Sequence, residues 1–462
     1  MLDHVIDNDP AAVAITMVTK SGLEDLLAGL APMARDWVKA NAFTAEPGGV
    51  CLVPAATGGI AAVLLGVAED PDPWAFAGLP GKLPPGSYHI EFSPDATTAT
   101  QAAVAWALGT YAFNRYKSRN GRVWPSLVWP ELADRGHAER LVRAVALVRD
   151  LVNTPAADLG PAELADAAGR VAARHGADMA VIAGDALLTE NYPAIHAVGR
   201  AAAPHRQPRL IDLTWGKATA PRVTLVGKGV CFDTGGLDLK PSSSMKLMKK
   251  DMGGAAHALA LADMIMGAGL PVRLRLLIPA VENAVSGDAM RPLDVLRTRK
   301  GLTVEVGNTD AEGRLILADA LAEASRDKPD LLLDIATLTG AARTALGPDL
   351  PALFCNNDLL ASGLLRAGEA EGDPLWRLPL HKPYRRMLDS KVADLGNVSD
   401  SPHAGAITAA LFLQEFVAAG IPWAHLDVLA WNGSARPGRP EGGEAMALRA
   451  LYAVVAQRFS GG

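Results

Sequence analysis

Apolar and polar positions alternate in short blocks along the first third of the chain. Short apolar runs bounded by turn residues predict strands at 12–18, 61–67 and 87–93. Apolar residues at helical spacing predict one helix over 98–118 and a second over 137–155, closed by Asn153 and Pro155. The stretch between these helices carries tryptophan, proline and glycine, so a linker is predicted there.

From about residue 160 the pattern changes to short apolar strands that alternate with helices. Strands are predicted at 209–215, 222–230, 272–280, 302–308, 330–338 and 423–430. Helices are predicted at 253–269, 314–327 and 404–420. Apolar strands separated by helices predict an α/β fold with a mostly parallel central sheet covered by helices. In such sheets, ligands bind where loops leave the carboxyl ends of the strands.

The length of the chain, 462 residues, exceeds that of one ordinary domain. Together with the change of pattern, it predicts a smaller N-terminal α/β domain at 1–134. A connecting helix at 135–159 and a larger α/β domain at 160–462 follow.

Composition narrows the classes of partner and compartment. Acidic residues exceed basic ones by 50 to 44, a net charge of -6, so the chain has no bulk attraction for nucleic acid or anionic membranes. No apolar run approaches ~18 residues, and the first residues show no secretory leader. Three scattered cysteines without a C-x-x-C motif favour a reducing compartment. We expect a cytoplasmic protein with neither a membrane nor a nucleic-acid partner.

Charged residues gather unexpectedly in the segment "GNTDAEGRLIL", 307–317, between a predicted strand and a predicted helix. Asp310, Glu312 and Arg314 stand at every second position, and in an extended segment such residues point the same way. The alternative is an ordinary helix start, where acids favour the helix dipole and Asp310 caps the first turn.

A second group of charged residues weakens that alternative. Lys228 and Asp233 follow another predicted strand, Lys240 lies in a loop rich in glycine and serine, and Asp251 precedes a helix. Carboxylates that converge resist joint ionisation unless cations neutralise them. A set of carboxylate oxygens suits Mg2+, Mn2+ or a two-zinc hydrolytic site.

Other motifs give weaker evidence for a functional site. "FDTGG" contains the Asp-Thr-Gly of aspartic proteases, but that mechanism needs two copies and the sequence has one. His257 and His425 lie in apolar periodic segments and are predicted to be core residues rather than ligands. The lysines at 246, 249 and 250 are interpreted as a solvated face in preference to a phosphate-binding patch.

The segments "VGKGVCFDTGGLDLKPSSSMKLMKKDMGGAA" and "NTDAEGRL" resemble the signatures of the leucyl (cytosol) aminopeptidases, which are two-metal exopeptidases. "DIATLTGAARTALG" and "AGAITAALFLQEFV" with "WAHLDV" extend the resemblance over about 150–430. The N-terminal third is supported by "ALGTYAFNRYK" alone. The resemblance makes 160–462 a catalytic dinuclear-metal aminopeptidase domain.

The resemblance implies a role for each matching residue. One metal ion would be held by Asp233, Asp310 and Glu312, and a second by Lys228, Asp233, Asp251 and Glu312. These ions would be Mn2+ or Zn2+, two per subunit, and a hydroxide bridging them would attack the first peptide bond. Lys240 would act as electrophile, and Arg314 would hold a bicarbonate as proton shuttle. Substrate-binding positions would be Met248, Asn308, Thr337, Leu338 and Gly340.

The implied activity is release of N-terminal amino acids from short peptides by a homohexamer. One departure from the family stands near the C-terminus, where Gly443, Glu444 and Ala445 replace an Ala-Thr-Gly-like segment. Glu444 is expected close to the side-chain pocket, where it would favour polar or basic N-terminal residues. The alternatives are a regulatory or DNA-binding protein on the same scaffold, and a two-metal hydrolase acting on esters or phosphates.

Overall fold

The computed structural model describes residues 1–462 except 71, 73, 92–94, 118–120 and 461–462. The chain divides into two compact units, one of 1–146 with 434–441 and one of 147–433 with 442–462. The division falls inside helix α5 (Arg135–Asn153), within the predicted connecting segment. The return of 434–441 to the first unit has no signal in the sequence pattern.

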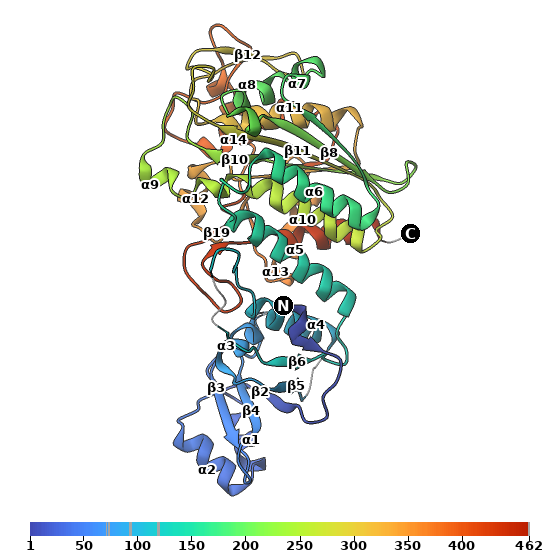
Figure 1. Ribbon diagram of the computed structural model, residues 1–462, viewed down its shortest axis with the longest axis vertical. Coiled ribbons are helices and arrows are strands. Elements are labelled where there is room, and N and C mark those ends of the chain that lie inside the picture. Colours follow the sequence, from blue (N-terminus) through green and yellow to red (C-terminus); the bar gives the residue numbers. More distant parts are fainter. Residues whose placement is uncertain (71, 73, 92–94, 118–120, 461–462) are drawn as a thin grey trace. The chain divides into compact units, whose positions relative to one another are not determined.

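The first unit contains a six-stranded sheet in the order β1-β6-β5-β2-β4-β3 (Figure 1). Its strands are β1 (Val5–Ile6), β2 (Val13–Val18), β3 (Val50–Pro54), β4 (Ile60–Gly66), β5 (Ser87–Ile90) and β6 (Ser126–Val128). Helix α4 (Ala96–Gly109) begins at Asp95, whose carboxylate accepts a hydrogen bond from the Thr98 backbone at 2.8 Å. The predicted helix over 98–118 was too long, because α4 ends at Gly109, a residue with low helix propensity; residue 118 itself lies outside the described residues.

The second unit is built on a nine-stranded sheet. Its central strands β18, β14, β9 and β11 run parallel to one another, as predicted. Its path is β16-β15-β18-β14-β9-β11-β8-β7, and β10 pairs with β11 off that path. The bounds are β7 (Asp178–Ala183), β8 (Arg209–Trp215), β9 (Arg222–Gly227), β10 (Gly229–Asp233), β11 (Arg273–Asn283), β14 (Leu331–Ala336), β15 (Ala352–Cys355), β16 (Trp376–Arg377) and β18 (Trp423–Asp427).

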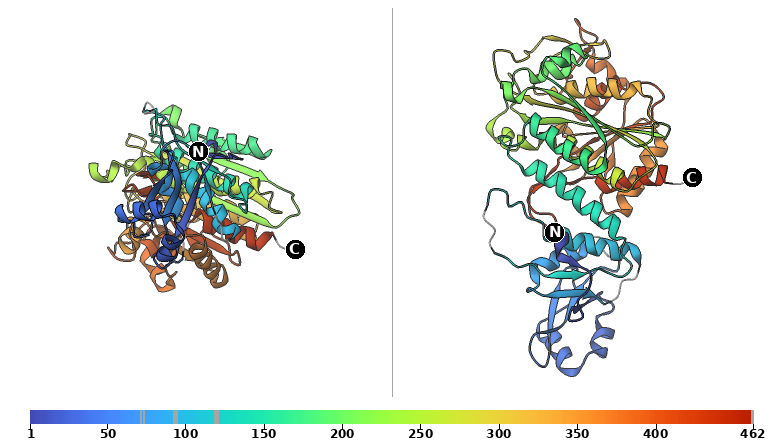
Figure 2. Two further views of the ribbon diagram at one scale, coloured as in Figure 1. Left: turned by 90° about the horizontal axis from the view of Figure 1, so that it is seen from below. Right: turned by 45° about the vertical axis from the view of Figure 1, so that its right-hand side comes forward.

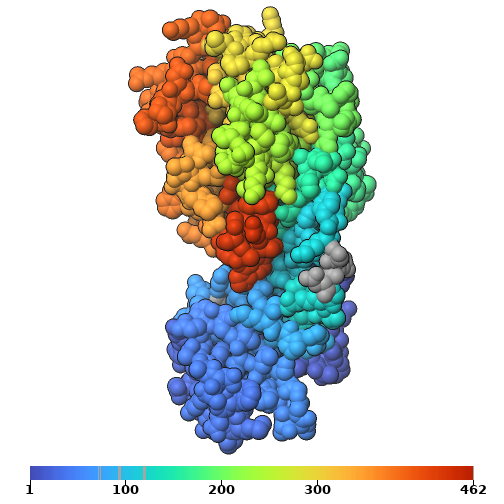
Figure 3. Space-filling model, turned by 60° about the vertical axis from the view of Figure 1, so that its left-hand side comes forward, coloured from blue at the N-terminus to red at the C-terminus, as the bar shows by residue number. Residues whose placement is uncertain are grey.

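Helices cover both faces of this sheet, which explains why its strands are apolar throughout (Figures 1 and 2). One face carries α6 (Pro161–His175) and α10 (Gly253–Gly267), and the other carries α8 (Pro193–Gly199) and α11 (Glu312–Arg326). Further helices are α12 (Gly340–Leu346), α13 (Asp358–Ala370), α14 (Gly405–Gln414) and α15 (Leu448–Phe459). In the space-filling view, segments from the green, yellow and orange parts of the chain adjoin on one surface of this unit (Figure 3).

One predicted strand lies outside the main sheet. The segment 302–308 contains only β13 (Thr303–Glu305), which pairs with β12 (Val295–Arg297) and β17 (Leu395–Gly396) in a separate three-stranded sheet. The loop after β13 therefore does not leave the carboxyl edge of the parallel sheet, and that part of the prediction was wrong.

None of the helices in the described part of the chain is both long and apolar enough to cross a bilayer.

Candidate active site

A cavity of about 590 Å³ in the second unit is lined by every residue that the resemblance assigned to catalysis, metal binding or substrate binding. Its lining includes Lys228, Asp233, Lys240, Met248, Asp251, Asn308, Asp310, Glu312, Arg314, Thr337, Leu338 and Gly340. These residues come from segments as far apart in the sequence as 228 and 340, so the fold itself assembles the cavity.

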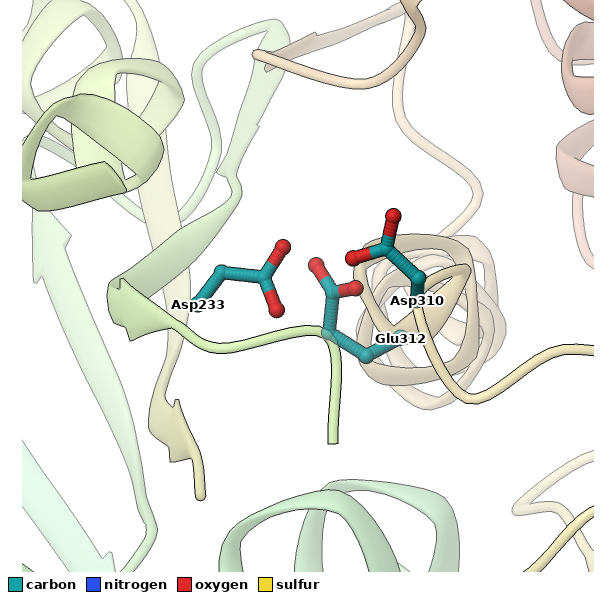
Figure 4. A group of neighbouring side chains, drawn as sticks. All are labelled: Asp233, Asp310 and Glu312. Carbon is teal, nitrogen blue, oxygen red and sulfur yellow. The ribbon is translucent and has the colours of Figure 1, made fainter. Parts of the chain in front are cut away.

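Three carboxylates converge in this cavity. Asp233 ends strand β10, Asp310 lies in a turn, and Glu312 is the first residue of α11. One oxygen from each lies within 4.8 Å of the others, and Figure 4 shows the three groups pointing toward one another. The expected alternation along an extended segment is not the reason, because a turn followed by a helix start brings Asp310 and Glu312 together. Asp310 does not cap α11 either, since the N-cap residue is Ala311.

Two lysines each contact two of the acids. The Lys228 ammonium lies 2.8 Å from Asp251 Oδ2 and 3.0 Å from Glu312 Oε1. The Lys240 ammonium lies 2.8 Å from Asp233 Oδ2 and also contacts Asp310 Oδ1. Each lysine thus touches two carboxylates.

The local backbone makes room for Lys228 beside Asp251 and Glu312. Lys228 stands between β9 and β10, and its ammonium also donates to the Thr337 carbonyl at 2.9 Å. A Cβ atom on Gly313 would lie 2.5 Å from Lys228 Cε, so any larger residue there would force the lysine to shift. On the other side, Thr337 donates to Asp251 Oδ1 at 2.7 Å.

The carboxyl pKa values reflect this crowding. Burial and the nearby charge of Asp233 raise the pKa of Glu312 to about 8 and that of Asp310 to about 6. Glu312 Oε2 is buried and has no hydrogen-bond partner among the described residues. Carboxylates with raised pKa values and an unpartnered oxygen form a donor set that a divalent cation would satisfy.

Arg314 lies in the first turn of α11, two residues after Glu312, and its side chain is buried. Its Nη1 donates to the Asn397 carbonyl at 2.6 Å, while its Nε has no partner among the described residues. Burial lowers the pKa of Arg314 to about 10. A guanidinium with a free N–H in a buried cavity can bind a small oxyanion.

Several residues that position the site were missed at the sequence level. Asn283 donates to Asp233 Oδ1 at 2.9 Å. Asn397 donates to the Asn308 carbonyl at 2.8 Å and accepts from the Gly307 backbone at 2.8 Å. Asp427 accepts from the backbone of Leu338 at 2.9 Å and so fixes the 337–340 segment. A single asparagine or aspartate far along the chain carries no local signal for such contacts.

The burial of Lys250 contradicts the interpretation that it belongs to a solvated face. Lys250 is 3% exposed and lines the cavity, whereas Lys246 is exposed and Lys249 donates to the Asn153 carbonyl at 2.6 Å. Burial lowers the pKa of Lys250 to about 8. Arg343, for which no role was predicted, lines the same cavity.

Glu444 is a second correction. Its carboxylate accepts from Arg149 Nη2 at 3.0 Å, and both side chains are buried. Glu444 is absent from the cavity lining. The expectation that it approaches the side-chain pocket was wrong, because the buried Arg149 holds it elsewhere.

The two histidines behave as core residues, as predicted. His257 Nδ1 lies 2.6 Å from the Gly253 carbonyl, and its Nε2 accepts from the Met446 backbone at 2.9 Å. His425 Nδ1 lies 2.5 Å from Asp334. His257 is held through both ring nitrogens and His425 through Nδ1.

Comparison with known proteins gives consistent matches over the chain. The model of the "Cytosol aminopeptidase family, catalytic domain" matches residues 146–452. The "M17 aminopeptidase, N-terminal domain" model matches 13–130. A probable cytosol aminopeptidase of Roseiflexus castenholzii is 42% identical over 372 residues, which cover 77% of this chain and 75% of that protein.

Solved structures agree with these matches. A cytosol aminopeptidase from Coxiella burnetii is 51% identical with a TM-score of 0.95, over 99% of this chain and 100% of that one. The bottromycin maturation enzyme BotP in complex with Mn is 36% identical with a TM-score of 0.86, over 97% and 99% of the two chains.

Proposed function

The chain belongs to the cytosol aminopeptidase family, and from this premise we propose that it is a metal-dependent aminopeptidase that releases N-terminal residues from short peptides. The observation that carries the proposal is the convergence of Asp233, Asp310 and Glu312 within 4.8 Å in the cavity. Family membership supports the aminopeptidase activity, and the converging acids support its dependence on metal.

The donor atoms fit two divalent cations. We assign one cation to Asp233, Asp310 and Glu312. The second is assigned to Lys228, Asp233, Asp251 and Glu312. The unpartnered Glu312 Oε2 supports this assignment. The relative solved with Mn supports Mn2+, and Zn2+ is the alternative because it also accepts carboxylate and amine ligands. When bound, such cations polarise a peptide carbonyl and lower the pKa of water, which provides a nucleophile near neutral pH.

Lys228 sets a condition on this arrangement. Burial alone would lower the pKa of Lys228, but Asp251 and Glu312 outweigh it and raise the pKa above its usual range. An ammonium has no lone pair, so Lys228 must lose its proton before its amine can serve as a ligand.

Lys240 and Arg314 supply the positive charge that the reaction needs. Asp233 and Asp310 outweigh burial and raise the pKa of Lys240, so it remains a cation at neutral pH. A cation fixed in the cavity stabilises the negative charge that develops on the carbonyl oxygen during attack. The free Nε of Arg314 suits a bicarbonate that relays a proton, as its planar fork matches a carboxylate-like ion.

The rest of the lining suits the end of a peptide. Met248, Asn308, Thr337, Leu338 and Gly340 surround a space of about 590 Å³, which is in the range of sites for small molecules. We assign these residues to substrate binding. The substrate's free α-amine, held beside the acids, would restrict cleavage to the first peptide bond.

The decisive experiment is a panel of amino-acid p-nitroanilides and amides assayed with Mn2+, with Zn2+ and with a chelator. We expect hydrolysis only of substrates with a free α-amine, lost with the chelator and restored by metal. Equal hydrolysis of N-acetylated substrates, or none of any substrate under every metal condition, would contradict the proposal.

We further propose a cytoplasmic homohexamer, in line with the family resemblance. The hexamer would confine the sites to an interior cavity and so limit substrates to short peptides. Light scattering at micromolar concentration should give about six times the mass of one chain, and a monomer would contradict this part of the proposal.

A further inference from the structure

Two cations in the cavity have no acidic partner among the residues that the structure describes. Lys250 is 3% exposed, Arg343 is half-buried, and both line the cavity. Neither side chain forms a hydrogen bond or ion pair with any residue that the structure describes. A buried ammonium without a partner is costly, so the fold keeps this charge at the expense of stability.

These two cations lie beside the residues assigned to substrate. Lys250 belongs to the 3-10 helix η4 (Met248–Met252), two residues after Met248. Arg343 lies in α12, and its Nη2 is 3.6 Å from the point where a Cβ on Gly340 would stand. Both side chains line the same cavity as Met248 and Gly340, so the cavity contains two cations in addition to those paired with the acids.

The nearby acids are engaged elsewhere. Asp251 contacts Lys228 and accepts from Thr337. Asp427 accepts from the Thr339 hydroxyl at 2.6 Å and from the Leu338 backbone at 2.9 Å. Because these carboxylates are held by other donors, the charge of Lys250 and Arg343 remains available to a ligand.

We propose that Lys250 and Arg343 bind the side-chain carboxylate of an acidic N-terminal residue, so that the enzyme prefers peptides beginning with glutamate or aspartate. This inference rests on the proposed aminopeptidase function and names its substrate class. The position of both cations beside Met248 and Gly340 favours the first side chain. A second source of the same chemistry is the C-terminal carboxylate of a very short peptide.

The test compares kcat/KM for glutamyl, glutaminyl and leucyl aminomethylcoumarin substrates, which have no C-terminal carboxylate. Glutamine matches glutamate in shape without its charge. We expect glutamate to exceed glutamine by roughly 10- to 100-fold, as for other charge-assisted hydrogen bonds. Lys250→Met and Arg343→Met should each reduce this ratio by about tenfold or more.

A matched control is available next to Lys250. Lys249→Met removes a lysine whose ammonium is held by the Asn153 carbonyl and which is absent from the cavity lining. The glutamate-to-glutamine ratio should stay as in the wild type. Since Lys250→Met removes a buried unpaired charge, its Tm should be no lower than that of the wild type, which separates a specific effect from misfolding.

A second pair of substrates distinguishes the two carboxylate sources. If Lys250 holds the C-terminus instead, Lys250→Met will lower kcat/KM for Leu-Leu relative to Leu-Leu-amide and leave the glutamate-to-glutamine ratio unchanged. That result would overturn the proposed preference for acidic residues.

Product binding gives a readout independent of turnover. L-glutamate should raise the Tm of the Mn2+-treated protein more than L-glutamine does, and Lys250→Met should abolish the difference. If leucyl substrates are cleaved while glutamate and glutamine behave alike, this inference fails and the aminopeptidase function stands. If no substrate is cleaved under any metal condition, both fail together.

Discussion

Two groups of charged side chains line one cavity and differ in whether the protein balances their charge; we call them the paired end and the unpaired end. At the paired end, each lysine contacts two carboxylates; this end comprises Lys228, Lys240, Asp233, Asp251, Asp310 and Glu312. At the unpaired end, Lys250 and Arg343 face the cavity without an acidic partner among the described residues. Buried charges are ordinarily paired, so the difference separates groups that the protein balances itself from groups left for a ligand.

The two groups also differ in the sign of the charge that remains unbalanced. Four carboxylates meet two ammonium groups at the paired end, and Glu312 Oε2 remains without a partner. This end therefore retains negative charge suited to cations. The unpaired end retains positive charge suited to a carboxylate. A substrate with an amine at one point and an acid at another would satisfy both ends.

The largest effect is expected at the paired end. Glu312→Gln removes the charge but keeps the shape, and under the metal interpretation kcat should fall by about 10²-fold or more, because loss of an outer partner alone costs roughly 10- to 100-fold. Bound metal should fall well below two per chain. If Glu312 only favours the start of α11, the change costs at most ~1 kcal/mol and activity survives.

A matched control uses an acid at the same position of another helix. Asp358 is the first residue of α13 and pairs with Arg377 at the surface. Asp358→Asn should leave both metal content and kcat near the wild-type values. Equal behaviour of the two variants would show that the paired end holds no metal.

Gly313→Ala should have the next largest effect. The added Cβ would stand 2.5 Å from Lys228 Cε and would displace the lysine from Asp251 and Glu312. We expect about a tenfold loss of kcat/KM together with weaker metal binding, since a small misplacement of a catalytic group is costly. Kinetics and metal analysis of the purified variant measure both effects.

The control is the same substitution in open space. Gly363 lies inside α13, and nothing lies within 4 Å of a Cβ there. Gly363→Ala should stabilise the protein by up to about 1 kcal/mol and leave the kinetics unchanged. Gly313→Ala variants with wild-type kinetics would show that Lys228 has room to move.

Regular elements could be predicted from the sequence wherever one pattern covered the whole element. Strand β8 spans Arg209–Trp215, as predicted, and α10 spans nearly all of its predicted range. The segment 302–308 was wrongly placed in the main sheet, because its local pattern is that of a strand and says nothing about the partner strand. Pairing is set by contacts with β12 and β17, which lie before and far after it in the chain.

The same limit applies to the site. Residues at the paired end stand in dense motifs whose chemistry is visible in the sequence. Lys250 stands in one of those motifs, but three neighbouring lysines suggest a solvated face, and its burial depends on how η4 packs. Asn397 has no local signal, because its role arises from long-range contacts with 307–314. A single arginine such as Arg343 does not show in the sequence that its side chain lines the cavity.

A pH change should produce a moderate effect. Before a cation binds, Glu312 has a pKa of about 8 and Asp310 of about 6, both raised by burial and by Asp233. Protons therefore compete with metal, and lowering the pH from ~8 to ~6 should weaken metal binding. Metal retained after dialysis at the two pH values measures this. Unchanged retention would mean that these carboxyls do not bind the metal.

Glu444→Ala is expected to have the smallest effect on specificity and a large one on stability. Glu444 forms a buried ion pair with Arg149 away from the cavity lining, so its removal leaves a buried guanidinium without its carboxylate. Breaking such a pair costs about 3–5 kcal/mol, and urea unfolding should show that loss. The ratio of kcat/KM for lysyl and leucyl p-nitroanilides should stay within about twofold of wild type, the range left for a residue that contacts no substrate. For Lys250→Met we expect the reverse: a changed glutamate-to-glutamine ratio of kcat/KM and undiminished stability. If Glu444→Ala shifts specificity as strongly as Lys250→Met does, pairing in the protein does not separate structural charges from those that select substrates.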